Sequence, residues 1–236
     1  MIPLRDDNPT TTPPIVTVGI IVFCGVVFLW QQTLRQEAAA IAVYAYGVVP
    51  AILFGHDTLP PGIERIPPEL TILTSMFMHG GWLHIIGNML YLWIFGNNIE
   101  DRLGHVRFVI FYFLCGTAAA LAQSLANTHS EVPMIGASGA IAGVLGAYLV
   151  LFPRAHVLVL VPLGFFIQLL RLPAMWVLGF WFILQLFQGG LMARGEEGGV
   201  AYLAHVGGFV AGIVLIFVLG GRPPAASPRA GRGPWS

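Results

Sequence analysis

The chemically informative residues of this chain are a serine, two histidines and an asparagine that interrupt long apolar segments. Ser138 opens one apolar segment, within the octamer GASGAIAG. His84 and Asn88 stand at the start of an earlier segment, and His205 stands at the start of a later one. Polar groups are costly inside apolar segments, so their presence indicates a functional site. A serine hydroxyl becomes a nucleophile when a base such as neutral imidazole takes its proton.

Taken singly, each of these residues also has an explanation in packing or bonding. Serine is common in membrane helices because it is small and can bond to its own backbone. Asn88 alone could join two helices, and a lone histidine could be a proton relay or a bonded core residue. Their joint placement at the starts of alternate apolar segments is much harder to explain by packing.

Acyl transfer also needs hydrogen-bond donors for the oxyanion of the tetrahedral intermediate. Asn88, His84 and the backbone N–H of Ser138 are the candidates for this role. The apolar segments on that side carry no deep Asp or Glu, so the buried carboxylate of soluble triads is not evident. The sequence therefore predicts a dyad of Ser138 and His205.

Glycines accompany both members of this dyad. Gly139 and Gly143 lie four residues apart in the segment that carries the serine. Gly208 and Gly212 share one helix face with His205, at spacings of three and seven residues. Since glycines let two helix backbones approach closely, the hydroxyl and the imidazole can reach hydrogen-bonding distance.

The composition is that of a protein largely covered by lipid. Of its 236 residues, 56% are hydrophobic and only 9% are charged, whereas soluble domains carry about 25% charged residues. A net charge of zero without a basic stripe gives no sign of a nucleic-acid partner. Cys24 and Cys115 both lie in apolar runs, so a disulfide framework or a metal site is not expected. We expect neither metal nor cofactor.

The hydropathy pattern predicts an all-α, polytopic membrane bundle of six helices within residues 15–220. The predicted spans are residues 15–34, 82–99, 108–126, 134–152, 174–188 and 200–219. Two further apolar stretches, 38–55 and 157–170, are interrupted by Pro and Gly, so we expect interfacial or packed segments there. Residues 100–107 and 189–199 are predicted to be polar connections.

Both ends of the chain are predicted to be disordered tails, residues 1–14 and 221–236. With six spans the two termini share one side of the membrane. That side carries eight arginines and the opposite side three, so both termini are predicted to be cytoplasmic. The three polar sets are separated by two crossings each and therefore meet on the non-cytoplasmic side. A crossing by residues 157–170 would place His205 opposite Ser138.

Four motifs, in order along the chain, resemble those of the rhomboid intramembrane serine proteases. They are HIIGN at 84–88, similar to HxxxN; EDRLG at 100–104, similar to ExRxG; GASG at 136–139, similar to GxSG; and AHVGG at 204–208 with Gly212, similar to AHxxGxxxG. The resemblance covers residues 70–219. Each motif alone is weak, but the ordered set is specific.

This resemblance implies a serine endopeptidase with Ser138 as nucleophile and His205 as general base. It implies that Asn88, His84 and the Ser138 amide hold the oxyanion, while glycines pack the helices around them: Gly136, Gly139, Gly143, Gly208 and Gly212. The implied substrates are single-pass membrane proteins, cut where small or helix-breaking residues loosen the helix and expose its carbonyl groups. Because the chain is short and shows neither a transit peptide nor an added soluble domain, we expect a prokaryotic inner membrane. Residues 35–70 would form a membrane-dipping loop.

The resemblance also places a lateral gate on the fifth span, at Trp176, Phe180 and Trp181. Two positions depart from the family pattern. Leu70 and Thr71 replace a frequent Trp-Arg pair in the first loop, and Ala142 stands where many members carry a tyrosine that stacks on the histidine. The packing of His205 must therefore come from elsewhere.

Three other histidines are predicted to lie outside the catalytic pair. His79 is predicted to be an interfacial side chain, with a supporting hydrogen-bond donor to the site as the alternative. His105 and His156 are predicted to lie in cytoplasmic loops.

Two other functions compete with the protease. A catalytically silent, rhomboid-like protein would hold membrane clients without cutting them, but inactive relatives lose the Ser or the His and this chain retains both. A small transporter or channel could use the same polar groups, but such proteins often show paired halves, and the sequence shows no internal repeat.

Overall fold

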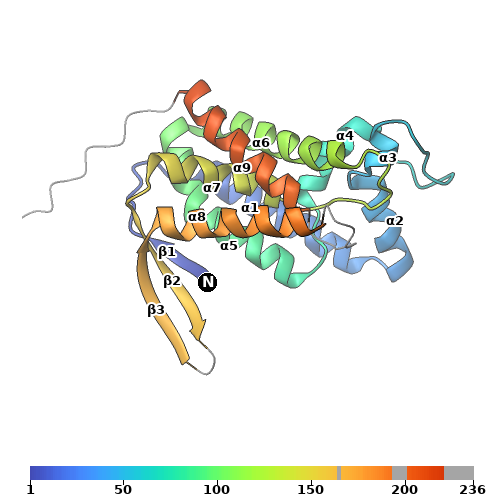
Figure 1. Cartoon of the computed structure of the whole chain (residues 1–236). Helices are drawn as coiled ribbons and strands as arrows, with labels where there is room; N and C mark the ends of the chain where they lie inside the picture. Colours follow the sequence, from blue (N-terminus) through green and yellow to red (C-terminus); the bar gives the residue numbers. More distant parts are fainter. Residues whose placement is uncertain (164–165, 193–200, 221–236) are drawn as a thin grey trace, which may run out of the picture.

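The computed structural model describes residues 1–163, 166–192 and 201–220, whose long helices lie side by side in one bundle (Figure 1). These helices are α1 (Ile15–Thr33), α5 (Trp82–Leu103), α6 (His105–Ala126), α7 (Ser138–Leu151), α8 (Ala174–Met192) and α9 (Tyr202–Val218). Each overlaps one of the six predicted segments, although α7 begins at Ser138 rather than at residue 134, and α5 and α8 extend beyond theirs. Among the described residues, two of them, α1 and α6, are long and apolar enough by themselves to cross a membrane.

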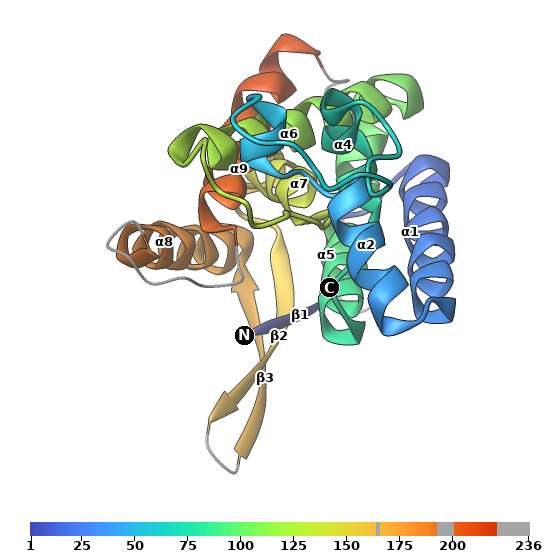
Figure 2. The same cartoon turned by 90° about the vertical axis from the view of Figure 1, so that its right-hand side faces the viewer.

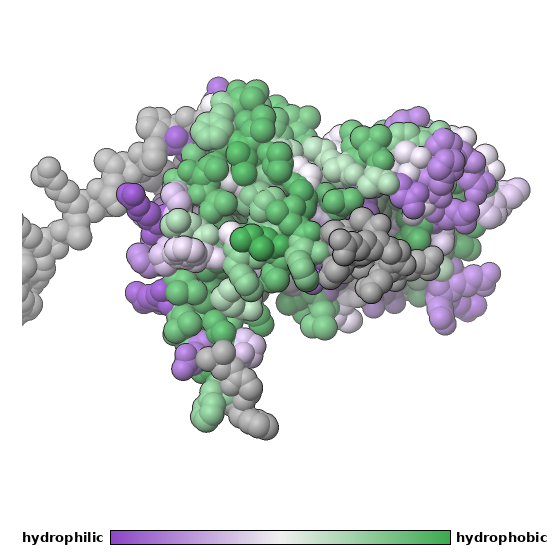
Figure 3. All heavy atoms as spheres, viewed as in Figure 1, coloured by the Kyte–Doolittle hydropathy of each residue, from purple (hydrophilic) through white to green (hydrophobic). Residues whose placement is uncertain are grey.

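Helix α7 is the centre of the bundle. Every residue from Gly139 to Tyr148 is buried, and the helix packs against α5, α6, α8 and α9. The outer helices instead expose large apolar side chains, such as Phe23 on α1 and Phe187 on α8. Figure 3 shows apolar atoms across the middle of the visible face and hydrophilic atoms gathered toward its two ends. This is the distribution expected of a protein surrounded by a bilayer.

Short helices occupy the segment between α1 and α5. They are α2 (Gln36–Tyr46), α3 (Pro50–Leu53), α4 (Pro68–Thr74) and the 3₁₀ turn η1 (Ser75–Phe77). None is long enough to cross a bilayer, so the stretch 38–55 is not a span. Val48 exchanges two backbone hydrogen bonds with Met134, at 2.7 and 3.0 Å, which tie this segment to the loop before α7.

A small antiparallel sheet at the opposite end of the bundle was not predicted. It consists of β1 (Ile2–Asp6), β2 (His156–Leu163) and β3 (Phe166–Pro173), in that order (Figures 1 and 2). The all-α prediction is therefore wrong for His156–Leu163 and Phe166–Pro173, and the prediction of disorder is wrong for Ile2–Asp6. The hairpin returns to the end of the bundle from which it left, so residues 157–170 do not cross the bundle.

A side-chain contact fixes strand β1 to the bundle. The Tyr148 hydroxyl, on α7, donates a hydrogen bond to Oδ2 of Asp6 at 2.6 Å. Burial raises the pKa of the Asp6 carboxyl above its ordinary value. Sequence patterning could not reveal this order, because the partners of β1 lie about 150 positions away along the chain.

Two predicted connections are partly helical. Helix α5 continues to Leu103 and α6 begins at His105, so residues 100–107 form a tight corner at Gly104, whose φ of 78° favours glycine. Helix α8 continues to Met192 and thus includes the start of the predicted 189–199 loop. The remainder of that loop and the predicted tail 221–236 lie outside the described residues.

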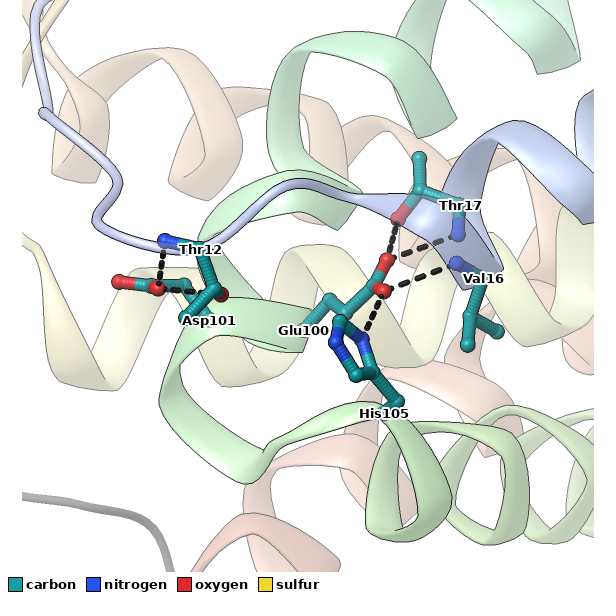
Figure 4. A network of polar contacts seen from close by, with 6 residues as sticks. All are labelled: Thr12, Val16, Thr17, Glu100, Asp101 and His105. Carbon is teal, nitrogen blue, oxygen red and sulfur yellow. Dashed lines mark hydrogen bonds and ion pairs between the residues drawn. The ribbon is translucent and has the colours of Figure 1, made fainter.

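The corner between α5 and α6 also carries a fully buried carboxylate, Glu100 (Figure 4). It accepts hydrogen bonds from the backbone N–H groups of Val16 (2.8 Å) and Thr17 (2.7 Å) and from the Thr17 hydroxyl (2.7 Å). Its Oε1 also lies 2.6 Å from Nδ1 of His105. Because the first N–H groups of a helix have no acceptor within it, Glu100 caps α1 and joins three helices.

Replacing Glu100 with alanine should destabilise the bundle. The Glu100→Ala variant leaves the N–H groups of Val16 and Thr17 without an acceptor, which should lower the free energy of unfolding by about 3 kcal/mol. Thermal unfolding of the purified protein in detergent measures this loss. Glu64→Ala, at an exposed position, is the control and should unfold like the wild type. Equal midpoints for the two variants would contradict the capping role.

Candidate active site

The structure brings Ser138 and His205 into contact. Ser138 is the first residue of α7, and His205 lies in the first turn of α9. The serine Oγ lies 2.9 Å from the Nε2 atom of His205. With the ring proton on Nδ1, Nε2 accepts the hydrogen bond from the hydroxyl, which is the arrangement that a general base needs.

Glycines make this contact possible, as predicted from their spacing. A Cβ atom at Gly208 would collide with the carbonyl oxygen of Gly139, and one at Gly212 would collide with that of Gly143. The backbones of α7 and α9 therefore touch directly, and a side chain at any of these contacts would move the helices apart. The predicted helix contact is confirmed.

His84 borders the same hydroxyl through Gly136. A Cβ atom at Gly136 would lie 2.8 Å from both Cε1 and Nε2 of His84, and 3.7 Å from Oγ of Ser138. The φ of 130° at Gly136 also favours glycine. Nδ1 of His84 accepts a hydrogen bond from the N–H of Gly80 at 3.2 Å, so the ring proton is on Nε2, the nitrogen beside Gly136.

Asn88 lies one turn after His84 on the same face of α5. Its side chain is buried, and the amide nitrogen has no hydrogen-bond partner among the described residues. A buried amide donor without a partner is unusual and calls for an explanation. No contact joins Asn88 to Ser138 directly. The N–H groups of the first turn of α7, including that of Ser138, have no acceptor within the helix.

Aromatic rings and an amide surround the other side of His205. Ala142 offers it no ring, but Trp181 of α8 lies with its ring centroid 5.8 Å from that of the imidazole, and Tyr202 lies at 6.4 Å. Oε1 of Gln185, also on α8, lies 2.6 Å from Nδ1 of His205. The sequence analysis missed Gln185. The signal was present, since Gln185 is a polar residue within the apolar segment 174–188.

His79 is buried, so the prediction that it is interfacial is wrong. Only 2% of the residue is exposed, and its ring centroid lies 5.1 Å from that of His84. The backbone N–H of His79 donates a hydrogen bond to Oε1 of Gln31 at 3.0 Å, which holds the segment against α1. Burial, with a smaller effect of the neighbouring His84, lowers the pKa of His79 to about 4.

The other two histidines lie in regular structure rather than in loops. His105 begins α6 and bonds to Glu100, and His156 begins β2 with its Nδ1 3.4 Å from Asp7 Oδ2. Both lie at the end of the bundle away from Ser138. Within the part of the chain that the structure describes, no group of three or more His, Cys, Asp or Glu residues could hold a metal ion.

A pocket opens beside Ser138. Much of its wall is formed by small residues of α6 and α9, namely Gly116, Ala119, Ala120 and Ala204. Met134 and Ile135, from the loop before α7, complete one side of it. The hydroxyl is therefore accessible beside a space that suits a small apolar group.

The chain is similar to proteins of one family. The Rhomboid domain model matches residues 68–222. RHOMBOID-like protein 5 of Arabidopsis thaliana is 32% identical over 152 residues, 64% of this chain and 44% of that protein. Rhomboid protein 1, mitochondrial, of Saccharomyces cerevisiae is 35% identical over 102 residues, 42% of this chain and 30% of that protein.

A bacterial relative is also found. Rhomboid protease GluP of Bacillus subtilis is 38% identical over 78 residues, which is 33% of this chain and 15% of that protein. The chain thus spans less than half the length of each of these three relatives.

An added methyl group at the contact of α7 and α9 should separate the two helices. In Gly212→Ala the new Cβ meets the Gly143 carbonyl oxygen, backbone that cannot turn aside. We expect a loss of about 3 kcal/mol in the free energy of unfolding, measured by thermal denaturation. Gly25→Ala is the matched control, because nothing lies within 4 Å of a Cβ there. Equal stability of both variants would contradict the contact.

The low pKa of His79 predicts a pH dependence of stability. Its ordinary pKa is 6.5 and its folded value is about 4. Below pH 6.5 the unfolded chain takes up a proton that the folded chain does not, so stability falls as the pH falls from 6.5 toward 4. Over this pH range the free energy of unfolding of His79→Asn should therefore fall by about 2–3 kcal/mol less than that of the wild type.

Thermal midpoints measured between pH 7.5 and 4.5 test this dependence. The difference between wild type and His79→Asn should change with pH. His156→Asn, at an exposed position, is the control and should follow the wild type. Parallel curves for wild type and His79→Asn would show that His79 is not the group concerned.

Proposed function

The chain belongs to the rhomboid family, and we propose that it is an intramembrane serine endopeptidase with a Ser138–His205 dyad. The family consists of integral membrane proteins, and its relatives here include a protease. The observation that supports the proposal most directly is the 2.9 Å hydrogen bond between Ser138 Oγ and His205 Nε2. These atoms come from segments 67 positions apart, and only folding joins them.

In the proposed reaction the Ser138 oxygen attacks the carbonyl carbon of the scissile peptide bond. His205 Nε2 takes the hydroxyl proton and then gives it to the leaving amine, so that an acyl-enzyme forms. Water then attacks the ester carbonyl while the same imidazole takes its proton. The imidazolium returns that proton to the leaving Ser138 oxygen, which regenerates the serine and releases the second product as an acid. No metal or cofactor takes part in the proposal.

Three donors would hold the oxyanion of each tetrahedral intermediate. The Nε2–H of His84 is available because Nδ1 is engaged by Gly80. The amide of Asn88 is a buried donor that has no partner among the described residues, and an arriving oxyanion would give it one. The Ser138 N–H, in the first turn of α7, adds a backbone donor.

We further propose that α1 and α5 to α9 cross the membrane, with both termini in the cytoplasm and the dyad near the opposite face. The apolar middle of the visible face and its two polar ends support the crossing of the membrane (Figure 3). The arginine distribution of eight against three supports the cytoplasmic side for the termini. The relatives include mitochondrial and chloroplastic proteins as well as a bacterial one. Family membership therefore does not select the prokaryotic inner membrane.

The substrates in this proposal are single-pass membrane proteins. Their helices hide the peptide carbonyls in hydrogen bonds, so the cleaved segment must unwind before attack. The small residues around the pocket, Gly116, Ala119 and Ala120, favour a small side chain next to the scissile bond. The silent client binder remains the second candidate, but it would not require the hydroxyl and the imidazole to be hydrogen-bonded.

Cleavage of a generic single-pass substrate in liposomes tests the proposal. Wild type should cleave with or without a chelator, whereas Ser138→Ala and His205→Ala should lose at least about a thousandfold in kcat. Two matched controls, Ser124→Ala and His156→Ala, change the same residue types outside the dyad. Both should cleave like wild type, since the Ser124 hydroxyl has no hydrogen-bond partner among the described residues and His156 is exposed. A serine-reactive fluorophosphonate probe should label only chains that retain the dyad.

Each other outcome has a definite meaning. Equal cleavage by wild type and both dyad variants would refute the dyad and indicate a contaminating protease. If the folded wild type shows neither cleavage nor probe labelling, the enzyme proposal is refuted and the client binder remains.

A further inference from the structure

We infer that Gln185 is a positioning residue of the proposed site. Its amide oxygen fixes the tautomer of His205, so the orientation of this histidine depends on the position of helix α8. This inference rests on the proposed hydrolase. It adds to the dyad a third residue, in the role that an acidic residue takes in soluble triads. The contact concerned is the 2.6 Å separation of Gln185 Oε1 from His205 Nδ1.

The two ring nitrogens of His205 have different roles. A neutral imidazole has one N–H and one lone pair, and only the lone pair can take a proton from serine. An amide oxygen can only accept, so its contact with Nδ1 requires the ring proton to be there. The lone pair is then on Nε2, which faces Ser138 Oγ at 2.9 Å. Without Gln185 the proton is free to sit on either nitrogen, and the ring is free to turn.

Burial shows that Gln185 is turned toward the site. It is 8% exposed, whereas its neighbours Leu184 and Leu186 are 38% and 48% exposed on the outer side of α8. A buried amide is unfavourable unless it is hydrogen-bonded. The hydrogen bond to His205 supplies the oxygen of Gln185 with its partner.

A neutral residue suits this position in a membrane protein. The aspartate of soluble triads orients histidine in the same way and also stabilises the transient imidazolium. An ionised carboxylate within a membrane helix is costly, however. Glutamine offers an acceptor oxygen of the same geometry without the charge. Glutamine can therefore orient the dyad without an acidic residue.

The three residues stand on three helices that are held differently. Ser138 on α7 and His205 on α9 are fixed by the backbone contact of those helices. Gln185 stands on α8, which packs on α9 through rings that include the stacked Phe182 and Phe209, with centroids 4.2 Å apart. The outer face of α8 is exposed. A displacement of α8 of about 1 Å would break the bond to Nδ1 and leave serine and histidine in contact.

Substitution of Gln185 tests its role. Gln185→Leu keeps the volume but cannot accept, and Gln185→Asn is one methylene too short. Both should lose about tenfold in kcat and in the rate of fluorophosphonate labelling, with KM within about twofold. Gln185→Glu keeps an acceptor at the right length and should retain the wild-type rate. Its carboxylate should move the acid limb of the pH–rate profile to higher pH by about one unit.

Controls separate positioning from packing and from failure of the enzyme proposal. Ile183→Ala, on the exposed face of the same helix, should behave as wild type. Wild-type kcat and pH profile in Gln185→Leu, with Ser138→Ala inactive, would overturn the role of Gln185 and leave the dyad standing. Undiminished cleavage by Ser138→Ala would instead overturn the proposed function. If its thermal denaturation shows that Gln185→Leu does not fold, Gln185→Asn and Gln185→Glu test the role of Gln185 instead.

A double-mutant cycle tests the link to α8. Phe182→Ala loosens the stack that seats α8 on α9, so it should slow probe labelling in the wild-type background. In the Gln185→Leu background it should have no further effect, because the bond that α8 controls is already gone. Losses that simply multiply would overturn the link to the position of α8.

Discussion

The direct backbone contact between α7 and α9 is the interaction on which the rest of the arrangement depends. Gly139 and Gly143 on one helix face Gly208 and Gly212 on the other, and no side chain separates them. In a bilayer, apolar side chains gain little by leaving lipid, so close packing of small residues is what joins helices. The contact places Ser138 Oγ 2.9 Å from His205 Nε2 at the N-terminal ends of the two helices, where a longer interhelical distance would leave them apart.

Two buried polar side chains of the bundle, Glu100 and Gln185, join helices. Glu100 is bonded to the first N–H groups of α1, and Gln185 is bonded to His205. Each of these two thus links helices in a setting where an unpaired group would be expensive. Other buried polar atoms, the amide nitrogen of Asn88 among them, have no partner among the described residues. Asn88 lies one turn from His84, where the proposed reaction would bring the charge of an oxyanion.

The two ends of the bundle are built differently. The end with the dyad is covered by short helices α2 to α4, which Val48 links to the loop before Ser138. The opposite end carries the capped corner at Glu100 and the sheet in which β1 pairs with β2. The site and the small sheet therefore lie at opposite ends, and substitutions in the sheet can be separated experimentally from effects on the site.

The sequence by itself determined the six long helices, the glycine faces, and the choice of Ser138, His205, His84 and Asn88 as one constellation, because periodicity and the cost of polar groups in lipid are local properties. Tertiary structure alone decided what depends on partners distant in the chain. Strand β1 is ordered because β2 offers it an edge, His79 is buried because α1 covers it, and Glu100 is a cap because α1 begins beside it. The role of Gln185 was likewise decided by tertiary structure, since its contact with His205 exists only because α8 lies against α9.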